Sequence, residues 1–140
     1  MRKIIFKARR LDNGEWVFGD LNHFSDSRAA VADSEQDWFL VDPETVCQYT
    51  GLNDKNGNRI FEGDRVLHNY MGSDLRGIVL FGEYADQRHR LDQGFYVRWQ
   101  DTVCSLRSDL GFWTTHRKIE VIGNIHDSKA VKMDAQTDSV

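Results

Sequence analysis

Hydrophobic and polar residues alternate over several short stretches of the chain, and this is the period of half-buried β-strands. The alternation runs through residues 3–9 and resumes over residues 15–21. Asp12-Asn13-Gly14 lies between these two stretches, and Asn-Gly is a strong signal for a tight hairpin connection. The amino-terminal part of the chain is therefore predicted to form a β-hairpin.

The rest of the chain also favours strands over helices. Further strands are predicted over residues 38–41, 64–69, 77–84, 94–100 and 120–125, and a short one near residues 111–115. Residues 20–37 are polar and irregular, and residues 27–34 within them are predicted as a loop, with one or two helical turns as the alternative. Asp42 followed by Pro43 and Glu44 predicts a single helical turn that extends through Cys47.

These elements predict a mainly β fold. Many short strands, one proline and no long helical period are typical of an antiparallel sheet that is barrel-like or strongly twisted, and an SH3-like barrel is one form of it. At most one or two short helical turns are expected. With 140 residues and 40% hydrophobic content, we expect one domain over residues 1–126 and a frayed tail over residues 127–140.

Two turn signals follow each other between residues 53 and 64. Asn56-Gly57 predicts a sharp chain reversal of type I′, because both residues tolerate positive φ. Gly63-Asp64 predicts the start of a strand, where glycine gives backbone freedom and aspartate binds a nearby amide. A calcium loop is rejected: with Gly57 at position six, positions one and twelve would be Leu52 and Gly63, where carboxylates are required.

Candidate catalytic and metal groups are scattered along the sequence. Glu62 and Asp64 form the pair to test as acid and base, since a spacing of two places both on one face of a strand, but backbone capping explains them more simply. Two cysteines, Cys47 and Cys104, are too few for a disulfide framework and are interpreted as reduced. Burial as small apolar residues explains them more simply than a role as nucleophiles does. No histidine has a zinc-like spacing to cysteine or carboxylate; the histidines are His23, His68, His89, His116 and His126. Neither a metal nor a cofactor is expected.

A nucleic-acid surface is the other chemical hypothesis. Tyr96 and Arg98 lie on one predicted strand, and Arg88 and Arg90 precede it, so aromatic faces and cations could meet on one surface. The simpler interpretation places the alternating residues Phe95, Val97 and Trp99 in the core and leaves Tyr96 and Arg98 as ordinary surface residues. A net charge of −4 disfavours strong nonspecific attraction to a polyphosphate.

The sequence resembles the YopX-like family of phage and prophage proteins. Four pieces carry the resemblance in order along the chain: RKIIFKARRLDNGEWVFGDL, VDPETVCQYTGLNDKNGNRIFEGDRV, GIVLFGEY and IEVIGNIHDS. Cys47 stands where the family usually has a small residue, which weakens any proposal that a cysteine there is a shared functional group. The resemblance implies a mostly β accessory protein of phage origin, with no established activity and no catalytic residues to transfer.

No residue pattern identifies a reaction, so we expect a binding module rather than an enzyme. Small β domains expose strand edges and loop tips that accept a partner's strand or seat aromatic anchors, so a protein partner is expected first. Single-stranded nucleic acid is the alternative partner, and a small enzyme with a dispersed site is the second alternative. Self-association is also expected to be feasible through the same strand edges. The chain has no segment long enough for a membrane helix and no secretory signal, which predicts a cytoplasmic location in a bacterial host.

Overall fold

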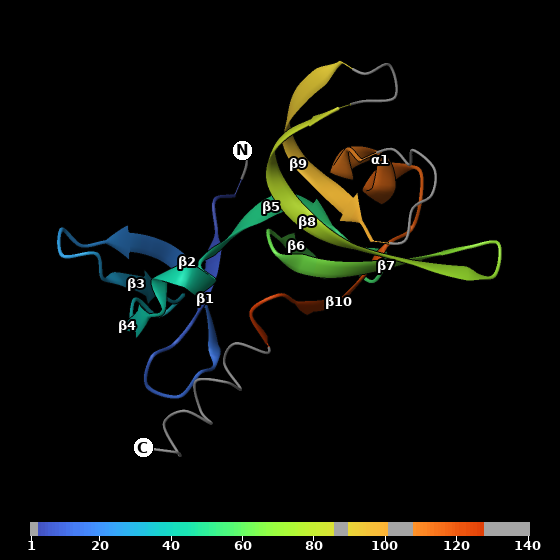
Figure 1. Ribbon diagram of the computed structural model, residues 1–140. Coiled ribbons are helices and arrows are strands. Elements are labelled where there is room, and N and C mark those ends of the chain that lie inside the picture. Colours follow the sequence, from blue (N-terminus) through green and yellow to red (C-terminus); the bar gives the residue numbers. More distant parts are fainter. Residues whose placement is uncertain (1–2, 86–89, 101–107, 128–140) are drawn as a thin grey trace, which may run out of the picture. The chain divides into compact units, whose positions relative to one another are not determined.

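The computed structural model describes residues 3–85, 90–100 and 108–127, which belong to two compact units (Figure 1). The first unit comprises Met1–Tyr49 with His126–Val140, and the second comprises Thr50–Ile125. Whether residues 1–126 fold as one domain stays a prediction. The predicted tail lies outside the described residues from residue 128 onward.

The first unit is built from short antiparallel strands. They are β1 (Phe6–Arg9), β2 (Trp16–His23), β3 (Ala29–Ala32), β4 (Trp38–Val41) and the start of β5 (Cys47–Asn53), with a 3₁₀ turn η1 (Pro43–Thr45) before β5. Their hydrogen-bonded order is β4-β3-β2-β1-β5. The predicted hairpin is confirmed, because β1 pairs with β2 from Phe6 opposite Gly19 to Arg9 opposite Trp16.

The second unit contains the longest strands of the chain. It holds the end of β5, then β6 (Arg59–Phe61), β7 (Asp64–Tyr70), β8 (Ser73–Ala85), β9 (Leu91–Trp99), α1 (Leu110–Thr115) and β10 (Glu120–Asn124). β6 pairs with β5, and the other four strands form a sheet of order β10-β7-β8-β9. Figure 1 shows β8 and β9 curving together along their length.

The fold is mainly β and antiparallel, as predicted, and its strands are strongly twisted. Within the described residues neither sheet closes into a barrel, so that form of the prediction is wrong. In the first unit a single bridge joins Arg10 to Val41, but it is too short to make a continuous ladder. Closure needs a consistent tilt and register shift through every strand, and the local strand pattern does not specify these.

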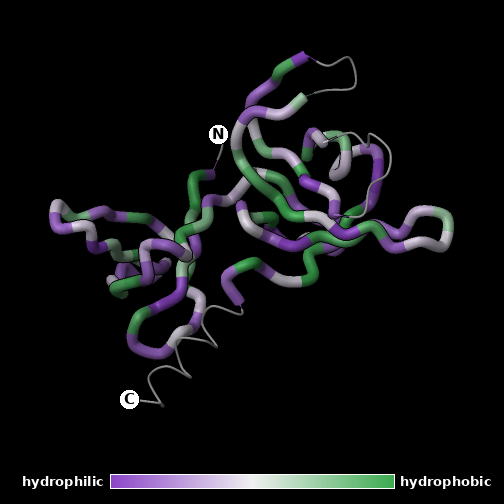
Figure 2. Tube along the Cα trace, in the orientation of Figure 1, coloured by the Kyte–Doolittle hydropathy of each residue, from purple (hydrophilic) through white to green (hydrophobic). Residues whose placement is uncertain are grey.

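Each unit has its own hydrophobic core, and Figure 2 shows hydrophobic stretches along the strands of both. The first core is small and consists of Ala8, Val17, Ala29, Val31 and Val41. The second is larger and aromatic, and consists of Ile60, Val66, Val79, Val97, Trp99, Leu110, Trp113 and Ile119. The prediction that Val97 and Trp99 belong to a core is confirmed.

The prediction of a loop or helical turn over residues 27–34 is wrong, because Ala29–Ala32 forms β3, an interior strand of its sheet. All four of its residues are buried between β2 and β4. Alanine has little preference for strands, and packing against neighbours overrides that local tendency. β2 approaches the β3 backbone so closely that a Cβ atom on Gly19 would lie 1.7 Å from the Ala32 carbonyl oxygen, so position 19 requires glycine.

The chain reverses at Asn56-Gly57, but the type I′ geometry predicted there is wrong. Gly57 has φ of 83°, whereas Asn56 is not among the residues with positive φ. The Asp54 carbonyl accepts from the Gly57 N–H, and the Asp54 carboxylate accepts from the N–H groups of Asn56 and Asn58. These bonds favour a type I turn followed by a left-handed glycine. A two-residue connection with both φ values positive occurs instead at Met71-Gly72, between β7 and β8.

Other differences arise where a local pattern fits more than one structure. The predicted helical turn ends at Thr45, because Cys47 already pairs with β1, and strands β5 and β6 were not predicted. Residues 111–115 belong to helix α1 rather than to a strand, since Leu110 and Trp113 are buried three residues apart on one helix face.

Candidate functional site

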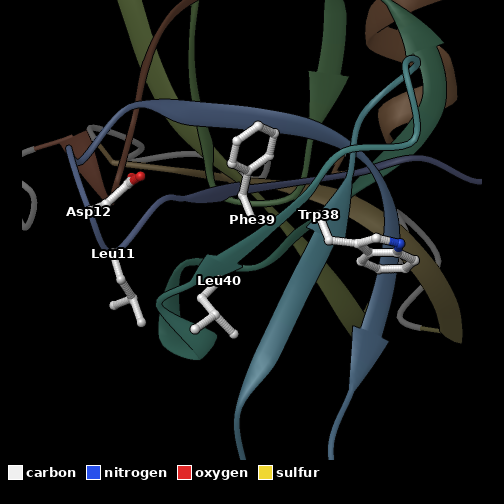
Figure 3. Close-up of a pocket in the computed structure, with 5 residues that line it drawn as sticks. All are labelled: Leu11, Asp12, Trp38, Phe39 and Leu40. Atoms are coloured by element: carbon white, nitrogen blue, oxygen red, sulfur yellow. The ribbon is translucent and has the colours of Figure 1, made fainter.

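One exposed apolar surface of the first unit lies on β4 and the turn after β1. An open depression of about 440 Å³ is lined by Leu11, Asp12, Trp38, Phe39 and Leu40. Figure 3 shows the side chains of Leu11 and Leu40 projecting the same way, with Phe39 pointing to the opposite side of its strand. We call Leu11, Trp38 and Leu40 the β4 surface.

Three large hydrophobic side chains on this surface face solvent. Leu11 is 52% exposed, Trp38 is 54% exposed and Leu40 is 45% exposed. A single exposed leucine needs no explanation, but an apolar cluster around an open depression is typical of an interaction site.

The backbone of β4 is also accessible on one side. The Leu11 N–H donates to the Leu40 carbonyl, and the Asp42 N–H donates to the Arg9 carbonyl, so the edge away from β3 is paired at its carboxyl end. Backbone groups point to alternate edges along a strand, so those of Trp38 face the same edge as those of Leu40. No described residue pairs with that edge at Trp38. β4 therefore presents both apolar side chains and a short open edge.

Charges around the β4 surface are mostly negative. Asp33, Glu35 and Asp37 form the turn that leads into β4, and the Asp33 carboxylate accepts from the N–H groups of the other two. Asp12 lies in the lining and forms an ion pair of 2.6 Å with Arg10, whose guanidinium stacks 4.0 Å from the centre of the Phe39 ring.

The ion pair between Arg10 and Asp12 is reflected in both pKa values. The hydrogen bond from Arg10 lowers the pKa of Asp12, and the same bond raises the pKa of Arg10. Because Asp12 is exposed and Arg10 is only partly covered, the pair fixes the local geometry more than it stabilises the fold. It leaves Asp33, Glu35 and Asp37 as the excess charge beside β4.

The predicted nucleic-acid residues are only partly brought together. Tyr96 and Arg98 lie two residues apart on the face of β9 opposite the core, with Arg98 exposed and Tyr96 half-buried. Arg90 lies before the start of β9, roughly 26 Å from Arg98 along a straight strand. Arg88 lies outside the described residues.

Strand register places two other arginines beside Arg98, and sequence analysis missed both. Arg65 on β7 and Arg98 on β9 are both register partners of Ile78 on β8, and Arg76 lies two residues before Ile78. The sequence shows that Tyr96 and Arg98 are two residues apart on one strand. It does not show that β7 and β8 pair beside β9 and so bring Arg65 and Arg76 near Arg98.

The proposed acid–base pair does not form a common site. Glu62 lies in the turn before β7, where Gly63 has φ of 88°, so the prediction that it shares a strand face with Asp64 is wrong. Asp64 is 1% exposed; its carboxylate accepts from the Phe61 N–H at 2.8 Å and from the Asn124 side-chain amide at 2.9 Å. Asp64 therefore holds the turn and β10 together through both oxygens. Burial raises the pKa of the Glu62 carboxyl group.

The remaining candidate groups lie far apart or in structural roles. Cys47 is buried and its thiol donates to the Thr45 carbonyl, while Cys104 lies outside the described residues. His68 lies on β7, bonded through Nδ1 to the Lys118 carbonyl and packed edge-on against Trp113. His116 ends α1, and His89 lies outside the described residues.

No metal or membrane element is found in the described part of the chain. Residues 3–85, 90–100 and 108–127 contain no group of three His, Cys, Asp or Glu side chains arranged to hold a metal ion. No helix in these ranges has the length and hydrophobicity needed to cross a bilayer.

The fold defines a class of small, mainly β proteins with two antiparallel sheets. The chain belongs to the YopX protein family, whose pattern it matches over residues 6–130. The fold is similar to that in the crystal structure of protein EF1440 from Enterococcus faecalis, with a TM-score of 0.52 and 21% identity over 94% of this chain and 99% of the other. No curated protein matches the sequence.

Proposed function

We propose that this chain is a non-catalytic binding module that takes up an extended segment of a partner protein along β4. The observation that carries the proposal is an edge strand that exposes Trp38 and Leu40 beside Leu11, with open backbone groups at Trp38. An added strand gains main-chain hydrogen bonds from such an edge and seats alternate side chains on its apolar surface.

The apolar contacts supply most of the expected affinity. A tryptophan side chain buries 150–250 Å² when fully covered, so covering the exposed half of Trp38 contributes about 3 kcal/mol. The leucines contribute smaller amounts of the same kind. Trp38 is therefore expected to be the residue whose loss weakens binding most.

The charges favour a particular partner. Asp33, Glu35 and Asp37 lie in the turn next to the edge, so an extended segment with alternating apolar residues and flanking lysine or arginine fits it best. A second copy of this chain would bring the same acidic residues together. The charge pattern thus supports a different protein as partner over self-association.

The biological setting is part of the same proposal. The resemblance to phage and prophage proteins supports an accessory role in a bacterial host cytoplasm. A binding role requires no catalytic group. Among the described residues, the candidate catalytic side chains lie apart or contact the backbone.

A pull-down from nuclease-treated bacterial lysate tests the proposal, with the tagged full chain and two variants as baits. Trp38→Ser removes the anchor, and Tyr70→Ser is the matched control, because Tyr70 is 52% exposed but lies at the end of β7 in the second unit. We expect one protein to be retained by the wild type and Tyr70→Ser and lost with Trp38→Ser. Circular dichroism checks that both variants fold.

Two results would contradict the proposal. Equal retention by Trp38→Ser and the wild type would show that the partner binds elsewhere. Light scattering that shows a dimer dissociated by Trp38→Ser would assign the β4 surface to a second copy of the chain.

A further inference from the structure

A second surface, in the second unit, combines cations with aromatic rings. Strand register places Arg65, Arg76, Arg98, Tyr84 and Tyr96 on the face of β7, β8 and β9 opposite the core. We call this set the arginine–tyrosine face. We propose that it binds single-stranded nucleic acid, with arginines holding phosphates and tyrosines stacking on bases.

The arginines form a compact group. Arg65 and Arg98 flank Ile78, so their Cα atoms lie two strand spacings apart, about 10 Å. Neither has an ion-pair partner among the described residues, and both are exposed. Arg76 is 52% exposed on its side chain and has only a long contact, 3.7 Å, with Asp74.

The tyrosines give the face its second property. Tyr84 and Tyr96 lie with ring centroids 5.4 Å apart and ring planes inclined by 31°. Gly82 and Gly94 are paired between them, and no atom lies within 4 Å of the position that a Cβ would take on either glycine. The paired glycines therefore place no side chain between Tyr84 and Tyr96 on this face.

Acidic residues of the same face lie at its margins and beside Tyr96. Asp92 is paired opposite Tyr84, far along β9 from Arg98, and Asp74 contacts Arg76 near the β7–β8 turn. Glu120 on β10 is paired opposite Leu67 and accepts from the Asn56 side chain at 3.4 Å. The centre of the face, from Arg65 across Ile78 to Arg98, carries only positive charge, whereas an isolated bridge places Asp109 opposite Tyr96.

The charge of the whole chain does not oppose this inference. The acidic excess lies outside residues 50–125, where basic and acidic residues are equal in number. Two of those acids, Asp54 and Asp64, are buried and accept hydrogen bonds from backbone amides.

The combination of exposed arginines with a tyrosine pair favours single-stranded nucleic acid as the ligand. A duplex offers phosphates but keeps its bases stacked, whereas an unpaired strand offers both phosphates and base faces at close spacing. Exposed arginines alone would fit any polyanion, and the tyrosine pair is what favours single strands. Because every base has a stacking face, little sequence preference is expected.

Fluorescence anisotropy of the full chain with labelled oligonucleotides tests the proposal. The probes are oligo-dT and oligo-U of about 12 nucleotides, within the usual footprint of a single small β module, and a duplex of equal length. We expect binding of the single strands in about 50 mM salt, with an affinity that falls along a log–log slope of about −2 as salt rises, as two to three phosphate contacts require. The duplex is expected to bind more weakly.

Variants separate the two parts of the face. Arg98→Gln is expected to weaken binding by about tenfold and to lower the salt slope by about 0.7, as the loss of one phosphate contact does. Tyr96→Leu is expected to weaken binding by about tenfold with the salt slope unchanged, because stacking releases no counterions. Arg117→Gln is the matched control, since Arg117 is exposed in the same unit but lies after α1.

Three results would overturn the inference. They are absence of binding to both single strands in about 50 mM salt, equal loss of affinity in Arg117→Gln and Arg98→Gln, and equal affinity for the duplex and the single strands. Circular dichroism of each variant ensures that lost binding is not lost folding. The β4 surface is not changed by any of these variants, so failure here leaves the proposed protein-binding function standing.

Discussion

Replacing Asp54 tests the strongest local claim of the structure, that one buried carboxylate joins a turn to a distant strand. Asp54 is 7% exposed. Its Oδ1 accepts from the N–H groups of Asn56 at 2.9 Å and Asn58 at 2.8 Å, and its Oδ2 accepts from the N–H of Val121 at 2.9 Å. Asp54→Ala leaves all three donors without this partner.

The expected cost follows from where those donors lie. Asn56 and Asn58 are exposed, so water replaces the carboxylate and each lost bond costs about 0.5–1 kcal/mol. Val121 is half-buried within β10, so its unpaired N–H costs about 1–3 kcal/mol. The sum is about 3 kcal/mol, a large part of the 5–15 kcal/mol that stabilises an ordinary domain.

Urea unfolding followed by tryptophan fluorescence measures this cost, since Trp99 and Trp113 lie in the core of the same unit. With a denaturant slope near 1.5 kcal/mol per molar, the midpoint is expected to fall by about 2 M. Asp54→Asn keeps one side-chain oxygen and replaces the other with an NH₂ group. The Val121 N–H then faces either this donor or an uncharged oxygen, so the free energy of unfolding is expected to fall by an intermediate amount, about 1–2 kcal/mol.

Asp74→Ala is the control, because the Asp74 side chain is 44% exposed and forms only surface contacts. Its loss is expected to cost about 0.5 kcal/mol. If Asp54→Ala unfolds at the same urea concentration as Asp74→Ala, the reasoning that this carboxylate links the turn to β10 is refuted.

Three further substitutions test other parts of the structure. Gly19→Ala places a Cβ 1.7 Å from the Ala32 carbonyl oxygen, so it is expected to separate β2 from β3 and to destabilise the first unit by about 3 kcal/mol or more, seen as a lower melting temperature. Glu62→Gln is expected to raise the melting temperature at pH 7, because burial raises the pKa of Glu62 and penalises its charged form; the gain should disappear below about pH 4, where the wild-type carboxyl is protonated in both states. A gain that persists there would contradict the assigned cause. Met71→Asn is expected to stabilise the β7–β8 turn by about 0.5 kcal/mol in urea unfolding, since Met71 has φ of 51° and is 88% exposed; a loss of stability would show that Met71 makes contacts that matter.

The features that the sequence predicted correctly depend on interactions within a few residues. The hairpin of β1 and β2 was predicted because alternation and an Asn-Gly corner act within a few residues. Asp42 and Pro43 start the 3₁₀ turn for the same reason, with the Asp42 side chain accepting from the Glu44 N–H. The wrong turn type at Asn56-Gly57 came from the dipeptide alone, whereas the Asp54 side chain decided the geometry.

The candidate surfaces were less predictable than the strands. Tyr96 and Arg98 were identified from alternation within one strand, but their neighbours Arg65 and Arg76 come from other strands. Trp38 and Leu40 were placed on a predicted strand without any sign that it would be a sheet edge. Edge position depends on the order of all the strands, and no local pattern encodes that order.

The sequence by itself determined the mainly β character of the chain, the positions of most strands and the sites where the chain turns, because these depend on side-chain alternation and on glycine, asparagine and aspartate in short segments. Only the tertiary structure decided that Ala29–Ala32 is an interior strand, that β4 exposes an apolar edge and that three arginines and two tyrosines share one face. Each of these depends on which strands pair and in what register. Pairing is set by packing between residues distant in sequence, where burial outweighs local preference.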